Sequence, residues 1–197
     1  MKKFLIFTIV FLFCMLYNQK HNIIVEEKQY INYEVKSYYN VPLSYELQDF
    51  IKKKCEQYGV NINTVFAVMK TESNFDSQAI SKNVNEPNKS IGLLQLNQNY
   101  IKWFTELTSI QNFDIYNIYH NLEGGIAVLS FYQKYWSKMG YSGVELEHHM
   151  LNSFNYGITQ YKRNIKNINL SSRSYSKKVQ ANKEGLKECV RVINIKE

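Results

Sequence analysis

The chain has 197 residues, of which 45 % are hydrophobic and 21 % charged. These proportions exclude a disordered protein and allow one domain with a sizeable core plus an extra segment. The formal net charge of +7 lies in residues 160–197, which hold 10 basic and 3 acidic side chains, while charges cancel in the rest. Such a patch suits a polyanion, either a nucleic acid or an anionic cell wall or membrane face, and a merely solvated helix face explains it equally well.

The N-terminus has the pattern of an export signal. Lys2 and Lys3 give a basic start, and residues 4–17 follow without a charge. This run is shorter than a membrane span, which needs about 20 residues, and is typical of a signal-peptide core. No small-residue cleavage site follows, so residues 1–20 are predicted to be a signal peptide or a membrane anchor. The protein is therefore expected to be exported, to the cell wall or the extracytoplasmic face of the membrane.

Residues 21–41 alternate loosely between apolar and charged side chains and are predicted to be a linker or a short extended segment. A helix is predicted next, with Ser44 as its N-cap and Glu46 in its first turn. Gly59 is the expected end of this helix. Its apolar stripe consists of Leu47, Phe50, Ile51 and Tyr58.

A second helix is predicted to begin at Asn63 or Thr64 and to end near Glu72. Three apolar residues share one face of it: Val65, Val68 and Met69. Glu72 continues the same stripe at the next turn. A carboxyl group among apolar neighbours loses solvation, so its pKa is expected to rise and it can hold a proton to donate. A glutamate that turns out of the stripe to solvent is the structural alternative.

The remaining sequence predicts a polar loop and further helices. The loop is expected over residues 76–90, and helices over 90–104, 121–139 and 144–155, with a last one after 171–172 that includes Tyr175, Val179 and Leu186. Asn121 is the expected N-cap of the long helix, and Gly140 and Gly157 are the expected stops. No stretch alternates cleanly enough to predict a β-strand, so the fold class is mainly α.

The cysteines and histidines give weak signals. Cys55 and Cys189 remain outside the N-terminal segment, and either a disulfide or two isolated core cysteines is compatible with the sequence. His148 and His149 follow Glu147, but adjacent histidines project from different sides of a helix, and a metal site needs three or four converging ligands. No metal or cofactor is therefore expected. The sequence also has no nucleophile elbow and no phosphate-binding glycine loop.

Five short motifs follow one another along the chain. They are E-S at 72–73, S-I-G-L-L-Q at 90–95, N-L-E-G-G-I at 121–126, S-F-N-Y-G at 153–157 and S-R-S-Y-S-K-K-V at 172–179. Together they resemble the lytic transglycosylase family with the goose-type-lysozyme-like fold. That family shows E-S at a helix end, then S-x-G-L-M-Q, N-x-x-x-G-x-x-Y/L, A-Y-N-x-G and T-R-x-Y-V-x-K-V. Each motif alone is weak, whereas five in this order over about residues 42–181 are specific.

The resemblance implies a single lysozyme-like catalytic (SLT) domain over residues 42–183, preceded by the N-terminal segment and linker and followed by a basic tail over 184–197. It implies cleavage of the β-1,4 bond between N-acetylmuramic acid (MurNAc) and N-acetylglucosamine (GlcNAc) in the glycan strands of peptidoglycan. Glu72 matches the family's single catalytic acid, and the product would carry 1,6-anhydro-MurNAc. Ordinary glycosidases need a second carboxylate. Four are available, none at a spacing that demands this role: Asp76, Glu86, Asp114 and Glu123.

The resemblance also implies supporting roles for residues near the acid. Ser73, Ser90 and Gln95 would hydrogen-bond the substrate or orient the acid. Gly92 would let the backbone approach the glycan closely. No nucleic acid is expected as a partner, a membrane tether through the N-terminal segment is possible, and a monomer is expected.

One position departs from the family pattern. Phe154 replaces the tyrosine of A-Y-N, whose hydroxyl is implied to contact the acid, while Asn155 matches the asparagine. Either Tyr156 or Tyr175 substitutes for that hydroxyl, or the acid lies in a drier pocket. The activity could also be that of a muramidase, which hydrolyses the same bond, or the chain could be a peptidoglycan-binding module that has lost catalysis.

Overall fold

The computed structural model describes residues 33–81, 88–170 and 174–194. The predicted signal or anchor segment, most of the predicted linker and Glu86 lie outside these ranges. The chain divides into two compact units, residues 37–191 and a second unit of residues 1–36 and 192–197, of which only the outer ends of two strands are described. None of the helices in the described ranges combines the length and the apolar character that a membrane span requires.

The first two helices begin and end at local signals. Helix α2 (Tyr45–Tyr58) starts after Ser44, whose hydroxyl accepts the Leu47 N–H at 3.3 Å, and stops at Gly59 with φ 69°. Both boundaries confirm the prediction. Helix α3 (Ile62–Glu72) ends at Glu72 as predicted, but its N-cap is Asn61. The predicted cap at Asn63 or Thr64 is wrong because the Asn61 side chain accepts the Thr64 N–H at 3.2 Å, so Asn63 and Thr64 already belong to the helix.

The predicted helix over 90–104 is wrong in its first half. Residues 90–97 form a small antiparallel hairpin of β2 (Ser90–Ile91) and β3 (Leu96–Asn97), followed by η1 (Gln98–Tyr100) and α4 (Ile101–Thr108). Gly92 has φ 78° and Gln95 has φ 44°, and these left-handed conformations end any helix. A side chain from elsewhere, that of Asn121, binds the backbone of this hairpin and takes the place of helical hydrogen bonds.

The long helix α5 (Ile118–Lys138) begins one turn before the predicted Asn121. Asn117 is its N-cap, with a side chain that accepts the N–H groups of Tyr119 and His120. Helix α6 (Gly143–Tyr156) ends at Gly157 as predicted. Two helices follow: α7 (Ile158–Leu170), which the sequence analysis does not predict, and α8 (Tyr175–Glu184), which stops before Leu186.

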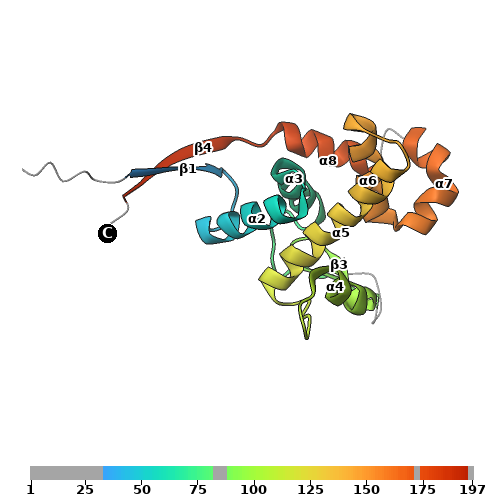
Figure 1. The fold of residues 1–197 in the computed structure, drawn as a ribbon, viewed down its shortest axis with the longest axis horizontal. Coiled ribbons are helices and arrows are strands. Elements are labelled where there is room, and N and C mark those ends of the chain that lie inside the picture. Colours follow the sequence, from blue (N-terminus) through green and yellow to red (C-terminus); the bar gives the residue numbers. More distant parts are fainter. Residues whose placement is uncertain (1–32, 82–87, 171–173, 195–197) are drawn as a thin grey trace, which may run out of the picture. The chain divides into compact units, whose positions relative to one another are not determined.

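Two strands contradict the expectation that the chain lacks clear strands. Strand β1 (Tyr33–Tyr39) lies in the predicted linker, where an extended segment was the alternative, and β4 (Glu188–Asn194) lies in the predicted basic tail. They pair with each other in a two-stranded sheet (Figure 1). The two strands are about 150 residues apart in the sequence, so no local pattern predicts that they pair.

The core is built around α3, which explains where Glu72 emerges. Residues 64–69 of this helix are all buried, and five of these six side chains are apolar, Thr64 being the exception. Helix α8 packs along α3 and also contacts α6, while α5 packs against α2, α4 and α6 (Figure 1). The predicted mainly α fold is confirmed. Glu72, at the last turn of α3, therefore sits where a buried helix reaches the edge of the core.

Candidate active site

Glu72 is a partly buried carboxyl group with one clear hydrogen-bond donor. The hydroxyl of Tyr175 donates to Oε1 of Glu72 at 2.6 Å. Burial raises the pKa of the Glu72 carboxyl above its ordinary value, and the hydrogen bond from Tyr175 lowers the pKa by a smaller amount. The carboxyl group thus does not turn out to solvent, and it retains a proton more readily than an exposed glutamate.

Tyr175 supplies the hydroxyl that the side chain of Phe154 lacks. It is the first residue of α8 and is only 6 % exposed. Burial and the nearby Glu72 carboxyl raise the pKa of the Tyr175 phenol well above 10, so the phenol remains a donor. Phe154 is half-buried and packs against the hydrophobic core. Of the two tyrosines proposed as substitutes, Tyr175 makes the bond to Glu72.

Ser73 connects the end of α3 to the hairpin loop, residues 92–95 between β2 and β3. Its hydroxyl lies 2.9 Å from the Leu93 carbonyl oxygen and 3.1 Å from the Met69 carbonyl oxygen. The hydroxyl proton is therefore directed at the protein backbone, which fixes the residue next to Glu72. Ser73 therefore uses its donor within the protein and does not offer it outwards.

The hairpin loop places Gln95 and Gly92 close to this point. The Gln95 side-chain amide donates to the carbonyl oxygens of Ala79 (3.0 Å) and Gly92 (2.9 Å). At Gly92 a Cβ would lie 2.6 Å from Nδ2 of Asn121, so a larger residue is excluded by the protein itself. Ser90 binds Ser81 through its backbone, with its N–H 2.9 Å from the Ser81 hydroxyl oxygen.

Asn121 is the functional-site residue whose role the sequence analysis misses. It is 2 % exposed, and its amide accepts from Leu94 N–H (3.1 Å) and donates to the carbonyl oxygens of Ile91 (2.8 Å) and Ile115 (3.3 Å). The Asn121 side chain thus binds the backbone of the hairpin, as Ser73 also does. The N-x-x-x-G spacing was the available signal, because Gly125 on the next turn of α5 gives Leu94 its space.

Asn155 and Tyr156 come from a different helix than Glu72 and Tyr175. They occupy the end of α6, where Asn155 is exposed and Tyr156 is half-buried. Within the described ranges, neither side chain is hydrogen-bonded to Glu72. The structure therefore brings together Glu72 and Tyr175, and places the hairpin loop beside them through Ser73.

The described candidates for a second catalytic carboxylate bind other groups of the protein. Glu123 is buried between α2 and α5, where Oε1 accepts from the Tyr58 hydroxyl (3.1 Å) and contacts Lys54 Nζ (2.7 Å). Asp76 and Asp114 are exposed and each accept a backbone N–H two residues later, which is the geometry of a turn. All three therefore have structural explanations.

The two adjacent histidines have separate partners. His149 is buried, stacks on Trp136 with ring centroids 4.6 Å apart and contacts the Tyr161 hydroxyl at 2.8 Å. His148 lies 2.6 Å from the Ser176 hydroxyl instead. In the part of the chain that the structure describes, no group of three His, Cys, Asp or Glu side chains could hold a metal ion.

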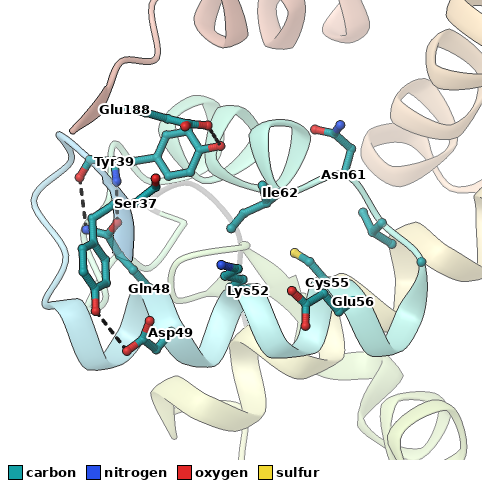
Figure 2. A pocket seen from close by; sticks show the side chains of 13 residues that line it. Ser37, Tyr39, Gln48, Asp49, Lys52, Cys55, Glu56, Asn61, Ile62 and Glu188 are labelled. Carbon is teal, nitrogen blue, oxygen red and sulfur yellow. Dashed lines mark hydrogen bonds between the residues drawn. The ribbon is translucent and has the colours of Figure 1, made fainter. Parts of the chain in front are cut away.

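A separate pocket of about 580 Å³ lies near the N-terminal end of α3 (Figure 2). Its walls come from α2, the turn into α3, the end of β1 and Glu188, and the Tyr39 hydroxyl donates to Glu188 at 2.7 Å. The free, buried thiol of Cys55 also lines it. None of the predicted site residues lines this pocket, and Glu72 lies at the other end of α3.

The chain is similar to a known protein family and to solved structures. The family model of the transglycosylase SLT domain matches residues 49–177. The 70 kDa soluble lytic transglycosylase from Escherichia coli is similar in structure, with a TM-score of 0.55 and 17 % identity over 72 % of this chain and 24 % of that chain. An inactive mutant of lytic transglycosylase Slt from Pseudomonas aeruginosa has a TM-score of 0.50 and 15 % identity, over 73 % and 22 %. No curated protein sequence matches the chain.

The similarity to these two solved structures shows the fold of the chain. This chain spans about a quarter of the length of the two solved structures. At such low identity they confirm only the predicted lysozyme-like arrangement of helices. Because the family match covers well over half of the sequence, including Glu72 and Tyr175, the chain belongs to the transglycosylase SLT domain family.

Proposed function

We propose that the chain is a peptidoglycan lytic transglycosylase that cleaves the β-1,4 bond between MurNAc and GlcNAc, with Glu72 as its single general acid and base. The observation that carries the proposal is the partly buried Glu72 carboxyl, whose pKa is raised by burial and whose Oε1 accepts the Tyr175 hydroxyl. Membership of the SLT family supports this activity at family level. The Pseudomonas aeruginosa structure is of an inactive protein with a glutamate-to-glutamine change, which agrees with one essential glutamate.

The proposed reaction uses one carboxyl group twice. Protonated Glu72 donates its proton to the glycosidic oxygen while the bond from that oxygen to C1 of MurNAc breaks, and GlcNAc leaves with a new hydroxyl group. The N-acetyl group of MurNAc stabilises the developing cation. The Glu72 carboxylate then takes the proton of the MurNAc 6-hydroxyl as its oxygen bonds to C1, which closes the 1,6-anhydro ring. Glu72 ends protonated and no water is consumed.

The pKa shift and the hydrogen bond suit these two steps differently. Burial favours the protonated acid that begins the reaction. The Tyr175 hydroxyl stabilises the carboxylate that forms after proton donation, because it remains a donor throughout. The described candidates for a second catalytic carboxylate all have other partners. This favours a substrate-assisted mechanism over one that uses a pair of carboxylates.

Substrate contacts are assigned to residues around the acid. We assign Ser90, Gly92 and Gln95 of the hairpin to one side of the glycan. Asn155, which is exposed at the end of α6, is assigned with Tyr156 to the other side. The proposed surroundings of the reaction are the cell wall or the extracytoplasmic face of the membrane. The domain over residues 42–183 would be monomeric and tethered or exported through residues 1–20.

Digestion of purified peptidoglycan, followed by mass spectrometry of the fragments, tests the proposal. Wild-type protein should release fragments that end in 1,6-anhydro-MurNAc, and Glu72→Gln should release none. Glu106→Gln is the matched control, because Glu106 is an exposed glutamate on α4, and it should act like wild type. Equal digestion by wild type and Glu72→Gln would show that Glu72 is not the acid.

The same assay separates the two alternatives. A muramidase would leave reducing MurNAc ends, because water would replace the 6-hydroxyl as the attacking group. A module that only binds peptidoglycan would release no fragments with either variant and would still sediment with the insoluble polymer. The bond from Tyr175 to Glu72 favours an enzyme over such a module, since it supplies the hydroxyl that Phe154 lacks.

A further inference from the structure

The placement of α8 depends on polar contacts. Of its ten residues only Tyr175, Ser176 and Val179 are buried, so its apolar contact with the core is small. Its first turn nevertheless has to be fixed closely, because Tyr175 lies there and reaches Glu72. Ser176, which stands where the family motif has valine, is completely buried and hydrogen-bonded.

Asn152 on α6 holds this first turn through two atoms. The backbone N–H of Ser176 donates to Asn152 Oδ1 at 3.2 Å, and a backbone N–H can only donate, so the orientation of the amide is fixed. Nδ2 of Asn152 therefore faces Oγ of Ser176 at 3.2 Å and Nε2 of His148, also at 3.2 Å. Asn152 has no exposed surface, so these bonds satisfy it inside the protein.

His148 completes the network with a defined tautomer. Because Asn152 Nδ2 is a donor, Nε2 of His148 has to accept. In the neutral ring Nδ1 then carries the hydrogen, and it donates to Oγ of Ser176 at 2.6 Å. The Ser176 hydroxyl can pass its own hydrogen to Ser174 Oγ at 3.3 Å. The side chains of Asn152, His148 and Ser176 thus all have hydrogen-bond partners.

We propose that Asn152, His148 and Ser176 are positioning residues that fix the first turn of α8 and thereby aim the Tyr175 hydroxyl at Glu72. The inference rests on the proposed role of Glu72 as the acid. None of the three residues touches Glu72, and each acts through Tyr175. The network lies next to Tyr175, the residue whose hydroxyl donates to Glu72.

The titration of Glu72 itself, followed by ¹³C NMR of labelled glutamate, tests the inference. The Glu72 signal is identified by its loss in Glu72→Gln. Tyr175→Phe should move the titration midpoint of Glu72 upwards, because it removes a bond that favours the carboxylate. Ser176→Ala, Asn152→Ala and His148→Ala should each move it in the same direction. None should add a further shift when combined with Tyr175→Phe.

Two variants control for a general loss of packing. Ser153→Ala removes an equally buried hydroxyl from the next position of α6. That hydroxyl accepts from Trp136 Nε1 on α5 and, among the described residues, is not hydrogen-bonded to α8, so the midpoint should not move. His148→Asn retains a donor near the position of Nδ1 and should restore a midpoint close to wild type.

The inference is overturned if the three alanine variants leave the midpoint unchanged, or if they shift it as much with phenylalanine at position 175 as with tyrosine. A shift in Ser153→Ala as large as in Asn152→Ala would also overturn it. The midpoint needs no turnover, so the result separates this inference from the proposed function. A wild-type protein that cleaves no peptidoglycan contradicts only the latter.

Discussion

The hydroxyl of Tyr175 lies 2.6 Å from Oε1 of Glu72, although the two residues are 103 positions apart in the sequence. The bond joins the last residue of α3 to the first residue of α8. Burial and this bond act on the Glu72 pKa in opposite directions, and burial is the larger effect. The pKa of the proposed acid therefore depends on how these two helices pack. A change in the burial of Glu72 and a change in its bond to Tyr175 would each alter this pKa.

Tyr175→Phe should shift the pH dependence of peptidoglycan cleavage. The bond from Tyr175 stabilises the Glu72 carboxylate and so lowers its pKa, and its removal should raise the pKa. A general acid works while it is protonated, so the basic limb of the kcat profile should move to higher pH. The maximal kcat should fall about 100-fold or more, because the carboxylate formed during the reaction loses a donor. Steady-state rates across the pH range measure both effects.

Tyr116→Phe is the matched control for this variant. Tyr116 is 60 % exposed, and the same loss of a phenolic oxygen there should leave the profile unchanged. A basic limb that stays in place or moves to lower pH in Tyr175→Phe would contradict the assigned role of the hydrogen bond.

Glu72→Gln should be more stable than wild type at neutral pH, although it is expected to lose activity. The folded-state pKa of Glu72 is raised above its unfolded value, so wild type loses stability as the pH rises through the folded pKa. Glutamine has no such dependence and can still accept from Tyr175. The difference in the free energy of unfolding should be small below the ordinary glutamate pKa and should grow above it. Urea unfolding at a series of pH values measures this, and a constant difference would contradict the prediction.

Gly125→Ala should destabilise the fold at the hairpin loop. A Cβ at position 125 would lie 2.2 Å from Cδ1 and 2.8 Å from Cβ of the buried Leu94. Leu94 cannot move away easily, because its N–H is held by Asn121. Overpacking of this kind costs about 1–3 kcal/mol, and the better helix propensity of alanine offsets about 1 kcal/mol of that.

Gly185→Ala is the control for Gly125→Ala, and urea unfolding compares the two. Gly185 has φ −83°, and the nearest atom to an added Cβ is 3.6 Å away, so its substitution should change stability by less than about 0.5 kcal/mol. Equal free energies of unfolding for Gly125→Ala and wild type would show that the loop adapts to the extra carbon.

The features that could be predicted are those fixed by neighbours in the sequence. Ser44 and Gly59 bound α2 through bonds within a few residues, and the apolar stripe of α3 depends on the helical repeat alone. The position of Glu72 at the end of that stripe follows from the same repeat. The raised pKa also agrees with the expectation, because the stripe is buried.

The features that could not be predicted depend on distant partners. Residues 90–97 carry helix-compatible side chains, but Asn121 binds their backbone from about 27 positions away and stabilises a hairpin instead. The sequence left Tyr156 and Tyr175 as equal candidates, since only the packing of α8 on α3 decides between them. The strands β1 and β4 could not be predicted for the same reason, because each pairs with a strand that is far away in the sequence.

Cys55 should resist alkylation in the folded protein. It is 4 % exposed, and burial raises the pKa of its thiol to about 12. Since the thiolate is the reactive form, only about 1 in 10,000 of these thiols is reactive at pH 8. Iodoacetamide should therefore modify Cys55 only after unfolding in urea, and peptide mass mapping distinguishes it from Cys14 and Cys189. Ser142→Cys provides an exposed reference thiol. Modification of Cys55 at the rate of that reference in native buffer would show that the pocket admits the reagent and leaves the thiol solvated.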